Sequence, residues 1–263
     1  MVDETILRGR RADSISMPAN RVVIGTFPGA LLIILALVAL PLARAEEPGP
    51  DWLLSFQEGL RLIQEDRPAE AIGHFQRAIE VNPDASEPYT AIRLASGLRG
   101  RSVGEVGVER GLIHLAHQQL QRDELDKAES VLKSLVQARF ANPEPHLLLQ
   151  ALYAKRGRPA ASDHAGKIFK GLLEALLATG DGKTPETAFL VQGIAEEYLV
   201  VGYVFRCRTR GQRVHFPPAG GVYDILEVVC ADGERSVYFD VTAWGPEPAW
   251  RLKTYRPAPQ KSP

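Results

Sequence analysis

The chain has 263 residues, of which 45% are hydrophobic and 24% are charged. This balance is typical of a folded globular protein and excludes a wholly disordered or collagen-like chain. There are 31 Lys and Arg residues against 32 Asp and Glu residues, a formal net charge of −1. The chain therefore lacks the bulk positive field of a nucleic-acid-binding protein. Its two cysteines exclude a disulfide-dense scaffold and a four-cysteine zinc module.

The first 45 residues have the composition of a secretory signal. Arginines precede an uncharged stretch, residues 22–43, whose centre is a run of eleven apolar residues. Ala43-Arg44-Ala45 follows as a small-x-small cleavage site. The apolar run is short for a bilayer span, which needs about 20 residues. We therefore expect residues 1–45 to be a signal peptide, with translation starting at Met1 or, for a signal of the usual length, at Met17.

An uncleaved signal anchor is the alternative interpretation of the same segment. In that case residues 22–43 would hold the protein in the membrane, with the basic side in the cytoplasm. Both interpretations predict that the rest of the chain is exported to the periplasm or the cell envelope. An anchor would be its sole link to a membrane.

Residues 51–179 carry helical periodicity, and the clearest signal lies in their first third. Small residues that allow two helices to approach closely alternate with bulky ones that fill the gap, and a proline ends the second helix: Gly59, Leu62, Ala71, Phe75, Ala78, Ile79, Val81 and Pro83. This pattern resembles the 34-residue tetratricopeptide repeat, from Trp52 to Ala85. It departs from that repeat at Ser55 and Glu58, which loosens the packing expected of the first helix.

Two weaker copies follow, with an extra helix near residues 87–98 before them. Their apolar positions are Leu112, Leu115, Ala116, Leu125, Ala128, Leu132 and Leu135 in one copy, and Leu147, Leu148, Leu152, Ile168, Phe169, Leu172 and Leu176 in the other. The resemblance implies about three helical hairpins that stack into a curved solenoid. Its concave wall would come from the first helix of each pair, and we expect Leu62, Leu112 and Leu115 to contribute to a binding groove there. The alternative is that the helices are only a spacer.

The composition changes near residue 180, after which alternating segments predict a small, mostly β domain over residues 184–255. The expected strands are residues 201–209, 222–230, 235–242 and 250–255, and residues 256–263 are expected to be a disordered tail. Ala231–Glu234 is expected to join the second and third strands as a hairpin. The overall fold class is therefore α+β, with an all-α repeat region followed by a small sheet.

Short motifs between residues 184 and 243 are similar to those of a small bacterial domain of unknown function: Pro185–Val191, Glu196-Glu197-Tyr198, Tyr223-Asp224-Ile225 and Val237–Val241. That domain occurs in exported proteins, sometimes behind tetratricopeptide repeats. The resemblance implies no reaction. Asp224 and Asp240 each lie between bulky strand residues, where an aspartate either forms hydrogen bonds at a hairpin end or contacts a ligand.

The two cysteines give conflicting indications. Export favours a disulfide between Cys207 and Cys230. A hairpin of strands 201–209 and 222–230, however, would separate the two residues by roughly 20 Å at the rise of a strand. A bridge needs α-carbons within about 7 Å, so the disulfide would require a different topology.

Several chemical motifs are incomplete. Gly180–Thr184 lacks the first glycine of a phosphate-binding loop, because Leu177 stands at that position. His114 and His117 share a helix face without a third zinc ligand, and His215 is a weak partner for Cys207 as base and nucleophile. Adjacent glutamates such as Glu196 and Glu197 point apart on regular structure, so they do not form a general acid–base pair.

Arg206, Arg208 and Arg210 form the one concentrated charge in this part of the sequence. On a strand they would form a solvated basic edge that discourages aggregation, with contact to anionic lipid or glycan as the alternative.

The sequence therefore predicts an exported, non-catalytic adaptor, without metal or cofactor, that binds a protein or peptide partner on its repeat helices. The alternative is a ligand-binding or hydrolytic site in the sheet domain that uses Asp224 and Asp240.

Overall fold

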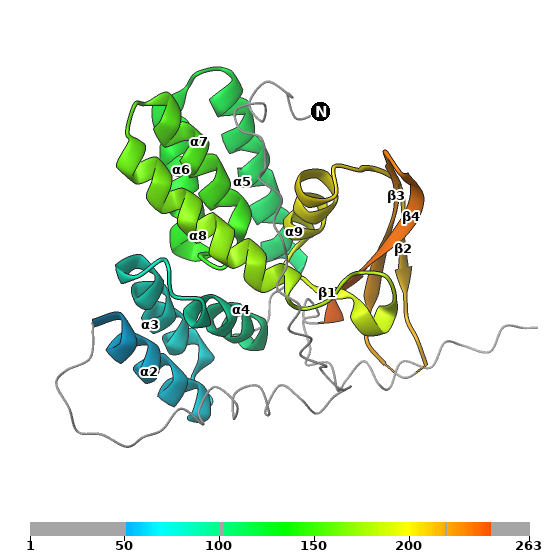
Figure 1. Ribbon diagram of the computed structural model, residues 1–263, viewed down its shortest axis with the longest axis horizontal. Helices are drawn as coiled ribbons and strands as arrows, with labels where there is room; N and C mark the ends of the chain where they lie inside the picture. The colour runs from blue at the N-terminus through cyan, green and yellow to red at the C-terminus, as the bar shows by residue number, and fades with distance from the viewer. Residues whose placement is uncertain (1–50, 100–102, 219, 243–263) are drawn as a thin grey trace, which may run out of the picture. The chain divides into compact units, whose positions relative to one another are not determined.

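The computed structural model describes residues 51–99, 103–218 and 220–242, which belong to one compact unit, Glu46–Pro263. The predicted signal, the predicted strand over residues 250–255 and the predicted tail lie outside the described residues. The described residues confirm the α+β class, with helices first and a four-stranded sheet after them (Figure 1).

Seven helices make up the first part of the described chain: α2 (Asp51–Gln64), α3 (Pro68–Val81), α4 (Glu87–Arg99), α5 (Val103–Gln121), α6 (Leu125–Ala138), α7 (Pro143–Lys155) and α8 (Pro159–Leu177). Three hairpins, α2/α3, α5/α6 and α7/α8, lie where the sequence predicts them, and α4 is the extra helix. None of the described helices is both long and apolar enough to cross a membrane.

The three hairpins turn in the same way. Each turn has one residue in the left-handed region: Asp66 (φ 57°), Asp123 (φ 60°) and Gly157 (φ 65°). In each turn the next residue donates its N–H to a carbonyl five positions back, as Arg67 does to Leu62. This is the hydrogen-bond pattern of a Schellman cap. The last two turns are 34 residues apart, so the sequence repeats with the structure.

The helices of each hairpin also approach each other at equivalent positions, 16 residues apart in sequence: Gly59 and Phe75, Ala116 and Leu132, and Gln150 and Gly166. A Cβ added to Gly59 would overlap the Phe75 ring, and one added to Gly166 would lie 2.6 Å from the Gln150 amide nitrogen. A small residue thus faces a large one, with the order reversed in the last hairpin. These shared contacts confirm a helical-repeat fold.

The second and third hairpins pack on each other in chain order, whereas the first hairpin joins them mainly through the extra helix α4. α4 packs against α3 on one side and α8 on the other, while α5, α6, α8 and α9 surround α7. Contact between α4 and α8 is close because Gly171 leaves room for the Tyr89 ring. Of the first helices, α5 and α7 therefore pack against each other, while α2 packs on α3 and α4.

The sheet part begins with the short 3-10 turn η1 (Pro185–Thr187), strand β1 (Phe189–Leu190) and helix α9 (Ile194–Leu199), which continues as the π-helical turn η2 (Val200–Val204). The predicted strand over 201–209 is therefore wrong over residues 201–207, and only Arg208 and Thr209 belong to a strand. Val200 and Val201 are buried against the sheet as part of a helix. A short apolar run does not distinguish a buried helix from a buried strand.

The sheet itself has the order β1-β4-β3-β2. Strand β3 (Tyr223–Cys230) is antiparallel to both its neighbours, β2 (Arg208–His215) and β4 (Gly233–Asp240). β3 and β4 form the predicted hairpin, with Cys230 opposite Gly233. β1 pairs with β4 in parallel. A bulge between Thr209 and Gly211 interrupts the register of the edge strand β2.

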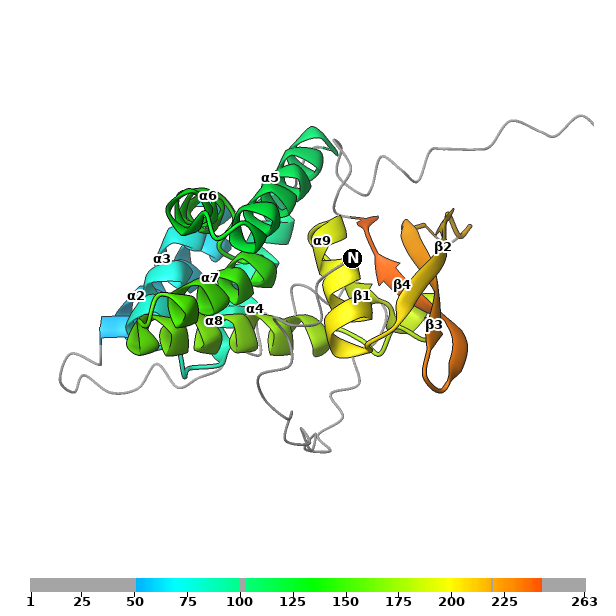
Figure 2. The same ribbon diagram turned by 90° about the horizontal axis from the view of Figure 1, so that it is seen from above.

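One face of the sheet packs against α9, η2 and the end of α8. Its core includes Leu176, Val201, Leu226, Val228 and Phe239, all buried. Because α9 packs on α5 and α7 and continues as η2, which packs on the sheet, the α9/η2 segment links the repeat helices to the sheet beside the end of α8 (Figure 2).

Candidate functional site

The most unusual group of side chains lies on α9, at the joint between the helices and the sheet. Glu196 and Glu197 are 1% and 0% exposed. Carboxylates are rarely buried without partners, because loss of water disfavours the charged form. The two residues are neighbours in sequence but have different partners. This agrees with the expectation that adjacent side chains on regular structure point apart.

Glu196 forms an ion pair with the repeat helices. Arg93 of α4 donates from Nη1 to Glu196 Oε1 at 2.7 Å and from Nη2 to Oε2 at 3.1 Å. The same Nη2 donates to the Leu190 carbonyl at 2.9 Å, and the backbone N–H of Gln192 donates to Glu196 Oε2 at 2.8 Å. This buried charge is therefore paired and hydrogen-bonded, the condition under which burial is tolerated.

Glu197 lies within hydrogen-bonding reach of Asp224 on β3. Burial raises the pKa of Glu197 to about 9, and the negative charge of Asp224 acts in the same direction. Burial also raises the pKa of Asp224, which is 5% exposed and accepts a hydrogen bond from the Gln212 amide. Two carboxyl groups thus face each other in a closed, largely dehydrated position.

The two aspartates predicted for a ligand site are not brought together. Asp224 is opposite Phe239 in the β3/β4 register and Asp240 is opposite Tyr223, so the two side chains project from opposite faces of the sheet. Asp240 Oδ1 accepts the Thr242 N–H at 2.9 Å, an interaction at the end of a strand. Within the described ranges, no group of three or more metal-ligating side chains is assembled.

The leucines predicted for the groove have different environments. Leu62 is 2% exposed and belongs to the core, so it cannot contact a partner on the surface. Leu112 is half-buried, whereas Leu115 is 39% exposed. Val108, seven residues before Leu115 and therefore on the same side of α5, is 65% exposed.

Two exposed glycines share this side of α5. A Cβ added to Gly107 or Gly111 would meet no atom within 4 Å, so neither glycine is needed for packing among the residues that the structure describes. We call the group of Gly107, Val108, Gly111 and Leu115 the α5 face. It is apolar, and its residues are small or exposed.

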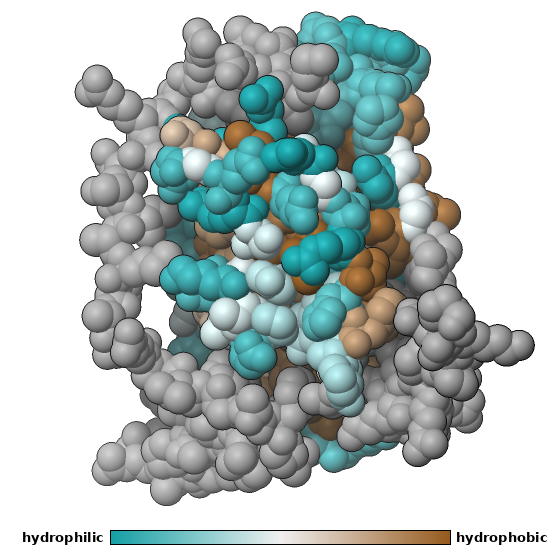
Figure 3. Space-filling model, turned by 90° about the vertical axis from the view of Figure 1, so that its right-hand side faces the viewer, coloured by the Kyte–Doolittle hydropathy of each residue, from teal (hydrophilic) through white to brown (hydrophobic). Residues whose placement is uncertain are grey.

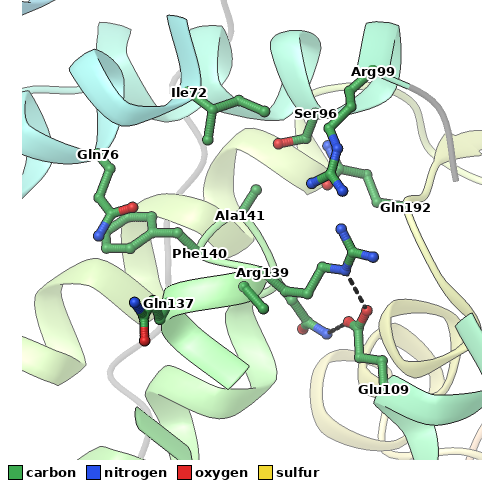
Figure 4. A pocket seen from close by; sticks show the side chains of 12 residues that line it. Ile72, Gln76, Ser96, Arg99, Glu109, Gln137, Arg139, Phe140, Ala141 and Gln192 are labelled. Atoms are coloured by element: carbon green, nitrogen blue, oxygen red, sulfur yellow. Dashed lines mark hydrogen bonds and ion pairs between the residues drawn. The ribbon is translucent and has the colours of Figure 1, made fainter. Parts of the chain in front are cut away.

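A small hollow of about 40 Å³ lies between α3, α4, α5 and the segment after α6 (Figure 4). Arg99 and Arg139 point into it, and Glu109 forms its charged floor, accepting from the Asn142 amide and lying 3.5 Å from Arg139 Nε. Its volume has room for a few water molecules. Because Arg99 and Arg139 also pair with Glu105, the charges of the hollow are engaged within the protein, and we interpret it as a polar junction between helices.

Cys207 and Cys230 form a disulfide with α-carbons 4.3 Å apart, so the predicted separation of about 20 Å is wrong. Strand β2 begins after Cys207, and Arg208 pairs with Val229. Cys207 precedes Arg208 and Cys230 follows Val229, so the two cysteines lie opposite each other just beyond the last pair of the β2/β3 ladder. The error came from placing the strand too early in the sequence.

The remaining polar motifs have ordinary surroundings. His114 contacts Gln118 at 2.9 Å, and His117 contacts Glu144 at 3.2 Å. Arg208 and Arg210 are exposed on the edge strand, where Arg210 pairs with Glu234 at 2.7 Å. Figure 3 shows the sheet side of the molecule, where hydrophilic side chains predominate across the centre and hydrophobic ones gather toward one margin.

Sequence comparison places this geometry in a family. The profile described as "Domain of unknown function (DUF4919)" matches residues 113–245, just over half of the chain. The chain belongs to this family. The matched region begins within α5 and includes Glu196, Glu197, Asp224 and both cysteines, whereas Arg93 lies outside it. No curated protein and no solved structure shows significant similarity to the chain.

Proposed function

We propose that the protein is an exported, non-catalytic adaptor that binds a protein or peptide partner through the α5 face. The observation that carries the proposal is the pairing of exposed apolar side chains with glycines that the chain's own packing does not require. Gly59, Gly166 and Gly171 each have a neighbour that a Cβ would overlap, whereas Gly107 and Gly111, like Gly73 on α3, do not. What distinguishes the two glycines of α5 is that they lie beside the exposed Val108 and Leu115.

Glycine inside a helix is unfavourable by about 1 kcal/mol relative to alanine. Two such residues on one side of α5 therefore lower its stability without a gain inside the protein. A partner that approaches the α5 backbone closely would explain why glycine occupies these two positions. Val108 and Leu115 would flank that partner with apolar surface.

The repeat architecture supports this choice of helix. The common turn, the 34-residue interval and the small-against-large contacts are those of tetratricopeptide-like hairpins, and α5 is the first helix of its pair. The tetratricopeptide resemblance implies that the first helix of each pair lines the binding surface of such an array. α7 is enclosed by other helices and Leu62 of α2 is buried, so α5 has the most accessible of the predicted groove residues.

The signal-like first 45 residues and the Cys207–Cys230 disulfide both support export, because disulfides persist in oxidising compartments such as the periplasm. The alternative of a hydrolytic site has weaker support. Asp224 is 5% exposed, and Asp240 is on the opposite face of the sheet.

The test compares capture by the purified chain, residues 46–263, from an envelope extract. A Val108→Asp/Leu115→Asp variant should lose the captured protein, because two charges would be desolvated on contact. Leu54→Asp on α2, where the native leucine is 47% exposed, is the matched control and should retain it. Equal capture by the α5 variant and the wild type, with both folded by circular dichroism, would rule out the α5 face.

A further inference from the structure

The Glu197–Asp224 pair lacks hydrogen-bond donors for several of its buried oxygens, and the adaptor role does not explain why. Both carboxyl oxygens of Glu197 and Oδ1 of Asp224 are buried and have no hydrogen-bond donor when the groups are ionised. A buried acceptor without a donor costs about 1–3 kcal/mol, and more when it is charged. Three such atoms on two neighbouring carboxyl groups require something that neutralises their charge.

Among the residues described by the structure, no neighbouring cation neutralises the pair. On α9 itself Glu196 adds negative charge, and the Arg93 guanidinium from α4 is already bound to Glu196. From α5, Arg110 stacks over the Tyr198 ring at 5.4 Å and acts on Glu197 only as a weaker, opposing influence. From β2, the Gln212 amide satisfies the other oxygen of Asp224. A single proton, in contrast, would turn one acceptor into a donor to the other carboxyl.

We propose that Glu197 and Asp224 form a proton-binding site that ties α9 to strand β3. One proton lies between the two carboxyl groups, so that Glu197 donates an O–H hydrogen bond and Asp224 accepts it. When the proton leaves to solvent at alkaline pH, two buried carboxylates repel each other and the sheet loses its polar connection to the helices. The burial of Glu197 and Asp224 is a property of the chain itself, so the site does not require a binding partner.

The direction of the pH effect follows from the raised pKa of Glu197, about 9 in the folded chain against an ordinary value of 4.5. Between these values the folded state binds one more proton than the unfolded state. Stability is therefore complete below about pH 4.5 and falls as the pH rises toward 9. One proton corresponds to about a tenfold loss in the folding equilibrium constant per pH unit across this interval.

The test is urea unfolding of the chain, residues 46–263, at several pH values from about 7 to 9. The wild type should lose stability as the pH rises, by about tenfold per unit. Glu197→Gln, which imitates the protonated group, should be more stable than the wild type at pH 9 and nearly independent of pH. Glu227→Gln, an exposed site on β3, is the matched control and should keep the wild-type slope.

A flat wild-type profile, or a Glu197→Gln variant with the same slope as the wild type, would overturn the proposal. Infrared spectroscopy of the wild type gives a second readout that needs no variant. A protonated-carboxyl C=O band should be present at pH 7 and disappear on alkalinisation. Absence of that band at pH 7, or stabilisation by added Ca²⁺ in its place, would show a cation site instead of a proton site.

Discussion

Arg93 on α4 and Glu196 on α9 form a bidentate ion pair across 103 residues of sequence, with both side chains almost completely buried. The pair fixes the first helices to the family domain, although Arg93 lies outside the matched region and Glu196 within it. Helix α4 is therefore connected to α9 by an ion pair as well as by the apolar packing of its neighbours.

Removal of Arg93 should be strongly destabilising. Arg93→Met leaves Glu196 as a buried charge with no cation, for which we expect a loss of about 3–5 kcal/mol in the free energy of unfolding. Arg93→Met/Glu196→Met should recover most of that loss, because neither charge remains. Urea denaturation of the two variants measures the difference. A double variant less stable than Arg93→Met would contradict this description of the pair.

Two glycines should respond to alanine with opposite signs. Gly59→Ala places a Cβ against the Phe75 ring and should lower stability by about 1–3 kcal/mol. Gly73→Ala on the neighbouring α3 meets no atom within 4 Å and should raise it by about 0.5–1 kcal/mol. Thermal unfolding of both variants is the measurement. The same sign for both would show that the close approach of α2 and α3 is not as described.

His146 should make the protein sensitive to acid. The ring is buried and donates to the Phe140 carbonyl at 2.9 Å, and burial lowers its pKa to about 4 from 6.5. The unfolded chain therefore binds more protons between these values, so stability is complete above about pH 6.5 and is lost as the pH falls toward 4. His146→Gln, which keeps a donor, should reduce that loss, whereas the exposed His114→Gln should not. A calorimetric pH series checks both.

The disulfide should contribute to stability and report on export. Cys207 and Cys230 are 23 residues apart, and closing a loop of this size is worth about 3 kcal/mol. Cys207→Ser/Cys230→Ser should be destabilised by this order, and a reductant should then have no further effect. In cells, thiol alkylation should find the bond in the full chain and free thiols in a chain that lacks residues 1–45. Identical thiol states in the two chains would remove this support for export.

The local structure of the helices could be predicted from sequence, because small and bulky residues recur at helical spacing. Gly59, Phe75 and Pro83 define the first hairpin without knowledge of the rest. The order in which the hairpins pack could not be predicted. It depends on contacts such as Tyr89 against Gly171, between residues far apart in sequence.

The buried carboxyl cluster could not be predicted from sequence for a related reason. Glu196 and Glu197 have the pattern of an exposed pair, and their burial follows from the packing of α9 on α5 and α7 and from its continuation into η2. The signal that points to their burial is two acidic residues that only Tyr198 separates from the apolar run Leu199-Val200-Val201. Alternation from Val201 onward predicts a strand there, and a strand that starts so early places Cys207 away from Cys230.

Site-specific photo-cross-linking tests the adaptor proposal most directly. A photoreactive amino acid is placed at Leu115 on the α5 face, or at Leu54 on α2, in the full chain expressed in its host. We predict a discrete cross-linked protein from Leu115 and none from Leu54, with the Leu115 product lost when Gly111 is replaced by leucine. Products from Leu54 alone, or a Leu115 product unchanged by Gly111→Leu, would contradict binding through the α5 face.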